Sequence, residues 1–152
     1  MSLQLAPGPT SLDRLETAIG RLQQKHGFQR VAGSDQEFPG GLIALLLTED
    51  PQRNLEVLDA CVILPEALKP LGSGVARWVA GPDTAPALMQ KFGVARAPAV
   101  VFLRDGQYLG GLNGIRDWRD YQAEVARLLD GPAQPRPIGI PVRAENTSGA
   151  CA

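Results

Sequence analysis

The sequence predicts an α/β domain in which a central mixed sheet of about four to five strands is flanked by helices. Residues 42–47 and 99–103 are apolar runs long enough for strands buried on both faces, and they alternate with segments of helical periodicity. Asp105 and Gly106 follow the second run, and an Asp-Gly pair supplies the positive φ angles of a tight hairpin turn. Residues 108–113 are therefore expected to return as an antiparallel strand.

The chain before the first apolar run is expected to form one helix and one short strand. The helix runs from a cap at Thr10 or Ser11 to His26, ahead of a glycine that stops it. Its apolar residues recur on one face: Leu12, Leu15, Ala18, Ile19 and Leu22. Residues 28–32 predict a short strand, and residues 33–41 predict a loop with one helical turn.

The chain after residue 47 completes the alternation of helices and strands. Residues 55–64 form an apolar segment of helical type, and Pro65, which follows it, marks either a helix start or a kink. Residues 75–80 predict the third strand, and residues 84–92 a helix that a glycine ends. Residues 117–129 predict the last helix, because large apolar residues recur there near helical spacing.

Composition indicates one globular domain with a tail. The 152 residues are 44% hydrophobic and 20% charged, with 15 basic and 16 acidic side chains. Basic residues do not cluster as nucleic-acid binding requires, and no apolar run spans a membrane. The N-terminus lacks a basic region followed by an apolar run, so a cytoplasmic protein without stable membrane insertion is expected. We expect residues 1–9 to be frayed, residues 10–130 to form the domain and residues 131–152 to be a proline-rich flexible tail.

Neither cysteine belongs to a known redox or metal-binding motif. Cys61 and Cys151 form no C-x-x-C pair, and His26 is the only histidine, so a zinc site or a catalytic triad is not expected. We therefore expect no metal, no cofactor and no enzymatic activity. Cys61 lies in an apolar segment, where cysteine behaves as a small hydrophobic residue. The alternative is a thiol redox sensor or oxidoreductase in which Cys151, on the tail, reaches Cys61.

Residues 81–114 resemble the C-terminal half of a thioredoxin fold. They contain a glycine-ended helix, a G-V-x-x-x-P segment ending at Pro98, an apolar strand and an Asp-Gly hairpin. The resemblance implies a cis peptide bond before Pro98 and a backbone at Ala97 that is offered to extended substrate chains. Thioredoxins carry C-x-x-C after the strand that matches residues 42–47. Residues 48–54, with the sequence TEDPQRN, contain no sulfur, so the resemblance implies the fold without its thiol centre.

Three motifs are similar to the HyaE/HupG group of hydrogenase maturation proteins. They are the D-P-x-R loop at residues 50–53, F-G-V-x-x-x-P-A at residues 92–99 and L-N-G-I-x-x-W at residues 112–118. The resemblance implies a cytoplasmic, non-catalytic chaperone for the small-subunit precursor of an uptake [NiFe] hydrogenase. That precursor carries iron–sulfur clusters and a twin-arginine signal peptide, and the group binds it before export and is linked to protecting it from oxygen. Other hydrogenase maturation proteins are a second class of partner.

The partner-binding site is predicted on two loops. Its residues are Glu49, Asp50, Pro51 and Arg53 on one loop and Arg96, Ala97 and Pro98 on the other. Unpaired main-chain groups beside the proline can pair with an extended peptide as an added strand. The carboxylates of the first loop, with Glu56 and Asp59, can attract a basic signal peptide. The alternative is that these carboxylates are solvated surface charges, and a structural subunit of another assembly remains the third functional class.

Overall fold

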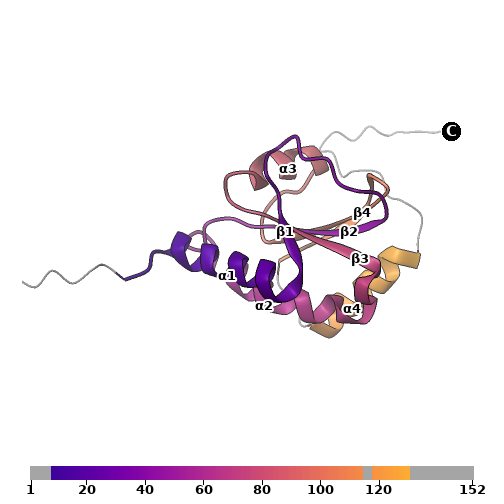
Figure 1. Cartoon of the computed structure of the whole chain (residues 1–152), viewed down its shortest axis with the longest axis horizontal. Coiled ribbons are helices and arrows are strands. Elements are labelled where there is room, and N and C mark those ends of the chain that lie inside the picture. Colours follow the sequence, from indigo (N-terminus) through magenta and orange to yellow (C-terminus); the bar gives the residue numbers. More distant parts are fainter. Residues whose placement is uncertain (1–7, 115–117, 131–152) are drawn as a thin grey trace, which may run out of the picture.

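The computed structural model describes residues 8–114 and 118–130, which form a mixed sheet with helices on both faces (Figure 1). The predicted tail lies outside the described residues, as do residues 1–7 of the predicted frayed N-terminus. The elements in chain order are α1 (Ser11–His26), β1 (Phe28–Arg30), β2 (Leu42–Leu47), α2 (Glu56–Leu68), the 3-10 helix η1 (Lys69–Gly74), β3 (Val75–Ala80), α3 (Ala85–Phe92), β4 (Ala99–Arg104), β5 (Gln107–Asn113) and α4 (Trp118–Asp130).

The five strands lie in the order β1-β3-β2-β4-β5, so β2 is the central strand. β2 pairs in parallel with β3 and antiparallel with β4, and β1 extends the parallel half beyond β3. The hairpin between β4 and β5 turns at Asp105 and Gly106, whose φ angles are 51° and 83°. The predicted mixed α/β sheet and its Asp-Gly turn are thus confirmed, because both residues adopt the positive φ that this turn requires.

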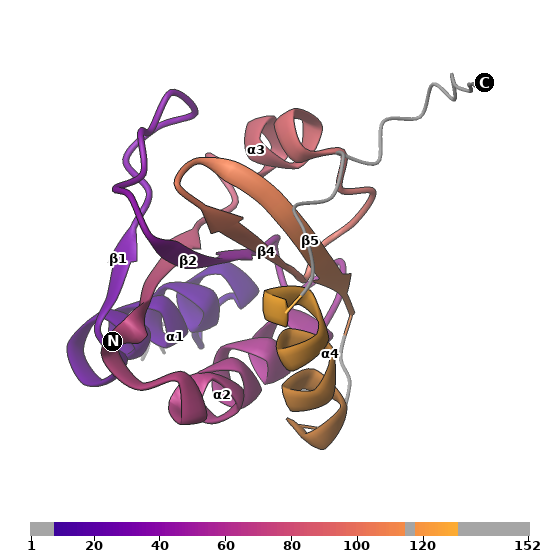
Figure 2. The same ribbon diagram turned by 90° about the vertical axis from the view of Figure 1, so that its right-hand side faces the viewer.

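Helices α1, α2 and α4 cover one face of the sheet and α3 covers the other (Figure 2). On the first face, α1 buries Leu15, Ile19 and Leu22 completely or almost completely. On the second face, α3 packs beside Trp78, whose ring meets Phe38 edge to face with centroids 5.1 Å apart. β2 therefore lies between two apolar layers, as its continuous hydrophobic sequence predicts.

The ends of α1 follow local sequence signals. The Thr10 hydroxyl accepts from the amide of Asp13, and the Asp13 carboxylate accepts from the amide of Thr10, at 3.0 Å in each case. These two bonds form a capping box, so Thr10 is the N-cap. Gly27 ends the helix in the left-handed conformation with φ 73°, which glycine adopts without a Cβ clash.

Pro65 lies inside α2, which excludes a helix start, the first of the two roles expected of it. Burial of the helix face around Pro65 offsets the cost of the lost amide hydrogen bond. Two other expectations differ from the structure. β1 ends at Arg30, since the Gln36 side chain accepts from the amide of Ala32 at 3.1 Å. Residues 33–41 contain a turn but no helical turn.

The last helix, α4, places Val125 in the core, as its periodicity predicts. The other apolar positions expected on that face are Trp118, Tyr121 and Leu128, whose side chains lie outside the described part of the structure. The expected first residue, Asp117, is outside it as well.

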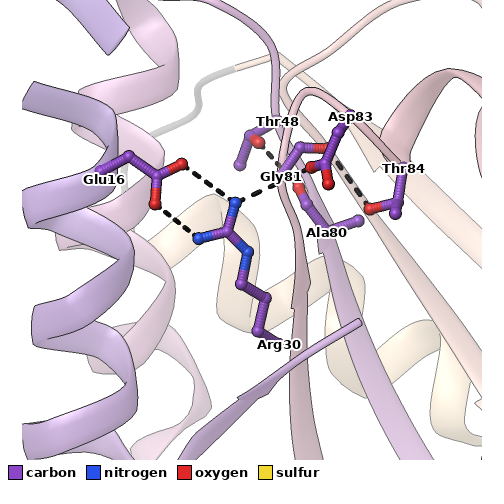
Figure 3. A network of polar contacts seen from close by, with 7 residues as sticks. All are labelled: Glu16, Arg30, Thr48, Ala80, Gly81, Asp83 and Thr84. Carbon is purple, nitrogen blue, oxygen red and sulfur yellow. Dashed lines mark hydrogen bonds and ion pairs between the residues drawn. The ribbon is translucent and has the colours of Figure 1, made fainter. Parts of the chain in front are cut away.

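A polar network joins the sheet edge to α1 and to the loop before α3 (Figure 3). The Arg30 guanidinium donates to both carboxylate oxygens of Glu16, at 2.6 and 3.0 Å, and lies 3.7 Å from Asp83. These hydrogen bonds lower the pKa of Glu16 and raise that of Arg30. Gly81 lies under the guanidinium, where a Cβ would come within 2.4 Å of Nη2. A side chain at Gly81 would therefore displace the Arg30 guanidinium from its place in the network.

Gly81→Ala is expected to lower the free energy of unfolding by about 0.5–1 kcal/mol, because the new methyl group displaces the Arg30 side chain from Glu16. Urea unfolding measures the change. In an Arg30→Ala background the same substitution should have little effect, since the displaced group is gone. Gly20→Ala is the matched control: nothing lies within 4 Å of that position in α1, and the change should stabilise the helix by about 0.5–1 kcal/mol. Equal losses at Gly81 in both backgrounds would contradict the role given to Arg30.

Candidate functional site

Two loops meet at the end of the sheet where β2 stops and β4 begins. Leu47, the last residue of β2, pairs with Ala99, the first residue of β4. The loop after β2 is residues 48–54, and the loop before β4 is residues 93–98. The peptide bond between Ala97 and Pro98 is cis, as the resemblance to thioredoxins predicts. The sheet register therefore brings the two predicted halves of the site together.

The cis-proline loop presents main-chain donors but not a fully free edge. Within the described residues, the amides of Arg96 and Ala97 donate to no protein acceptor. Arg96 is exposed, whereas Pro98 is buried and Ala97, backbone included, is only 2% exposed. The carbonyl of Ala97 already accepts from Asn54 Nδ2 at 3.3 Å. An added peptide can therefore reach the amide of Arg96, whereas Ala97 is buried and its carbonyl has an internal partner.

Asn54 is a site residue that the sequence analysis missed. Its Oδ1 accepts from the amide of Glu56 at 3.0 Å, so it caps the start of α2, and its Nδ2 is the donor to Ala97. Asparagine is a favoured residue at helix starts, which is the local signal that could have found the cap. The contact with Ala97 spans 43 positions and has no local signal. Asn54 thus links the α2 start to the cis-proline loop.

Asp50 is directed toward α1 rather than into the site. Its Oδ1 accepts from the Ser11 hydroxyl and from the amide of Gln52. These hydrogen bonds, the one from Ser11 first, lower the pKa of Asp50. The neighbouring Pro51 is buried. The Asp50 carboxylate therefore fastens the loop to the first turn of α1.

A groove of about 620 Å³ lies between the first loop and α3. Three predicted residues line it, namely Glu49, Arg53 and Arg96, together with the apolar side chains of Met89 and Val94. Glu49 Oε1 and Arg53 Nε are 3.8 Å apart. Because two arginines accompany one glutamate, the rim of this groove is not acidic. The other predicted residues, Asp50, Pro51, Ala97 and Pro98, are not part of its lining.

Cys61 lies in α2 within the apolar core and is 6% exposed. Burial raises the pKa of its thiol to about 12, and the protonated form is a poor nucleophile. In residues 8–114 and 118–130 there is no group of three or more side chains suited to a metal ion, and no helix long and apolar enough to cross a membrane.

The sheet order, the helices on both faces and the cis-proline before β4 define a thioredoxin-like protein. The loop that faces the proline holds no thiol and ends at Asn54.

Comparison with known proteins gives the family. The family model of hydrogenase-1 expression protein HyaE matches residues 18–121. Hydrogenase expression/formation protein HoxO of Cupriavidus necator is 37% identical over 97% of this chain and 94% of its own. HupG of Rhodobacter capsulatus is 34% identical over 73% of this chain and 83% of its own, and HoxO of Azotobacter vinelandii is 38% identical over 64% and 65%. The chain belongs to the HyaE family of hydrogenase expression proteins, which confirms the resemblance seen in its motifs.

Asn54→Ala is expected to lower the free energy of unfolding by about 1–2 kcal/mol, because it removes both a helix cap and the donor to Ala97. Asn54→Asp separates the two contributions: the carboxylate still accepts from the amide of Glu56 but cannot donate to the carbonyl of Ala97. The free energy of unfolding in urea should be highest for wild type, lower for Asn54→Asp and lowest for Asn54→Ala. If Asn54→Asp is as stable as wild type, the contact with Ala97 contributes nothing.

The Cys61 thiol should resist alkylation in the folded protein, because with a pKa of about 12 only about one thiol in ten thousand is ionised at pH 8. Iodoacetamide labelling of a Cys151→Ala variant, followed by mass spectrometry, isolates this thiol. Labelling should become fast only in denaturant. Rapid labelling of the native variant at pH 8 would contradict the burial and favour the redox alternative.

Proposed function

We propose that this protein is a non-catalytic chaperone of hydrogenase maturation that binds the small-subunit precursor of an uptake [NiFe] hydrogenase. Membership of the HyaE family supports a role in hydrogenase expression and formation, as the names of the relatives state. One observation carries the non-catalytic part: the cis-proline loop is present, but the facing loop presents Asn54 and no thiol. Disulfide exchange needs a thiolate, whereas holding a peptide does not.

The site holds an extended segment of the precursor through its backbone. The amide of Arg96, the exposed residue of the cis-proline loop, pairs with a peptide carbonyl, as in strand addition. Apolar side chains of the segment enter the groove beside Met89 and Val94, and polar ones meet Glu49 and Arg53 at its rim. Every one of these contacts is non-covalent, so the precursor can be released intact.

The precursor is the partner that the resemblance to the HyaE/HupG group implies. It carries a twin-arginine signal peptide and iron–sulfur clusters, so binding precedes export and takes place in the cytoplasm. A chaperone that covers the cluster-bearing body also limits the access of oxygen to it. Other hydrogenase maturation proteins are the second class of partner. The burial of Cys61 gives no support to the redox alternative.

The proposal is tested by the affinity of the fully reduced protein for a purified small-subunit precursor and for the same subunit without its signal peptide. Isothermal titration calorimetry measures both. Binding to at least one form is expected, and a Cys151→Ala variant should bind equally well because no disulfide between the two cysteines takes part. Failure of both forms to bind would overturn the chaperone function.

The acidic part of the predicted site is tested by neutralising its charge without disturbing the loop. Both hydrogen bonds to Asp50 use the same oxygen, Oδ1, so Asp50→Asn keeps them. Glu49→Gln/Asp50→Asn should weaken precursor binding about 3–10-fold if these charges attract the basic signal peptide. Asp35→Asn/Glu37→Gln is the control, since it removes the same charge from a loop outside the groove lining. Equal affinities for the two double variants would remove the electrostatic contribution.

A further inference from the structure

Helix α2 carries an exposed ridge on the side that faces away from the sheet. The ridge consists of Leu55, just before the helix, and Asp59, Val62 and Glu66, which follow at spacings of four, three and four residues. Leu55 is 69% exposed and Val62 is 66% exposed, although the opposite side of the helix is fully buried. Isolated exposed apolar residues are common, but Val62 lies between two apolar grooves and on the same line of the helix as Leu55, which indicates an interaction surface.

A groove lies on each side of Val62. The groove toward α1 has a volume of about 400 Å³ and is floored by Ala18, Leu22 and Cys61. The groove toward α4 has the same volume, about 400 Å³, and contains Ile63 and Pro70. Val62 and Glu66 line both grooves and form the ridge between them. A ridge between two grooves is the surface onto which another helix packs, because its side chains can enter both grooves around the central residue.

Charge is distributed unevenly along this surface. Glu56 and Asp59 are exposed near the start of α2. Arg21 and His26 of α1 line the groove beside the later part of α2. In that part of α2, Glu66 Oε1 lies 3.0 Å from Lys69 Nζ. The first turns of α2 are therefore acidic, whereas the last turns are mixed. A complementary helix has its basic end over Asp59 and an apolar body over Val62.

We propose that the α2 ridge binds the signal peptide of the precursor as a helix that runs in the same direction as α2. The proposal rests on the chaperone function and assigns a second surface to the same partner. A signal peptide begins with a basic region and continues with about 7–15 apolar residues, which is the required order of charge and apolarity. The ridge from Leu55 to Glu66 is about 16 Å long, enough for about eleven helical residues.

Two other occupants fit the ridge less well. The sequence of residues 131–152 contains four prolines, a residue that a helix interior disfavours. A second copy of the chain, related by a two-fold axis at Val62, would place Asp59 of one copy near Glu66 of the other. Like charges that meet in this way oppose association.

The test uses a fluorescein-labelled synthetic peptide with the signal sequence of the precursor, and anisotropy measures its affinity. Val62→Gln and Asp59→Lys should each weaken binding at least tenfold, since the first removes the apolar ridge and the second reverses its charge. Leu12→Gln is the matched control, because Leu12 is 45% exposed on α1 and does not line the grooves. Circular dichroism and urea unfolding confirm that each exposed substitution leaves the fold intact.

Binding of the subunit without its signal peptide tests whether the ridge is specific for the signal peptide. The ridge variants should bind that form as wild type does. Wild-type peptide binding that both ridge variants retain would overturn the inference but leave the chaperone function standing, whereas failure of wild type to bind either precursor form overturns both. A wild-type dimer in sedimentation that Val62→Gln converts to a monomer would also overturn it, since the ridge would then join two copies.

Discussion

The burial of β2 on both faces and both edges is the constraint on which the rest of the structure depends. Its six residues pair with β3 on one side and β4 on the other, and apolar layers cover it above and below. A shift of this strand by one residue would move every side chain from its own apolar layer to the opposite one. The end of β2 is consequently fixed against the start of β4 and the end of β3, which sets the distance between the two loops of the site.

Asn54 changes what a thioredoxin-like fold can do at that point. A cysteine at the start of α2 would face the cis-proline loop and favour covalent exchange through the helix dipole. The amide of Asn54 instead gives one hydrogen bond to the loop and accepts one from the helix. A group that stabilises the site in the absence of a ligand and forms no covalent bond suits a protein that holds its partner and releases it unchanged.

Local signals predicted much of the fold, because they reside in a few adjacent residues. Thr10, Gly27 and the Asp105-Gly106 pair each determine their own backbone, and all three predictions are confirmed. Contacts between distant residues could not be predicted in this way. The end of β1 depends on a side chain that folds back from the following loop, and Pro65 stays helical only because its surroundings are apolar.

The candidate site shows the same division. The sequence indicated which two loops form it, since their motifs are local. It gave no indication that Asp50 turns toward Ser11, because the partners are 39 positions apart. The acidic character expected at these loops is offset by two arginines that line the same groove.

The hydrogen bond between Ser11 and Asp50 has a consequence for one loop of the candidate site. It places the first turn of α1 against the loop after β2, although neither residue lines the groove. Loss of the Ser11 hydroxyl would therefore loosen that loop from outside the groove, without changing any residue that a partner would contact there.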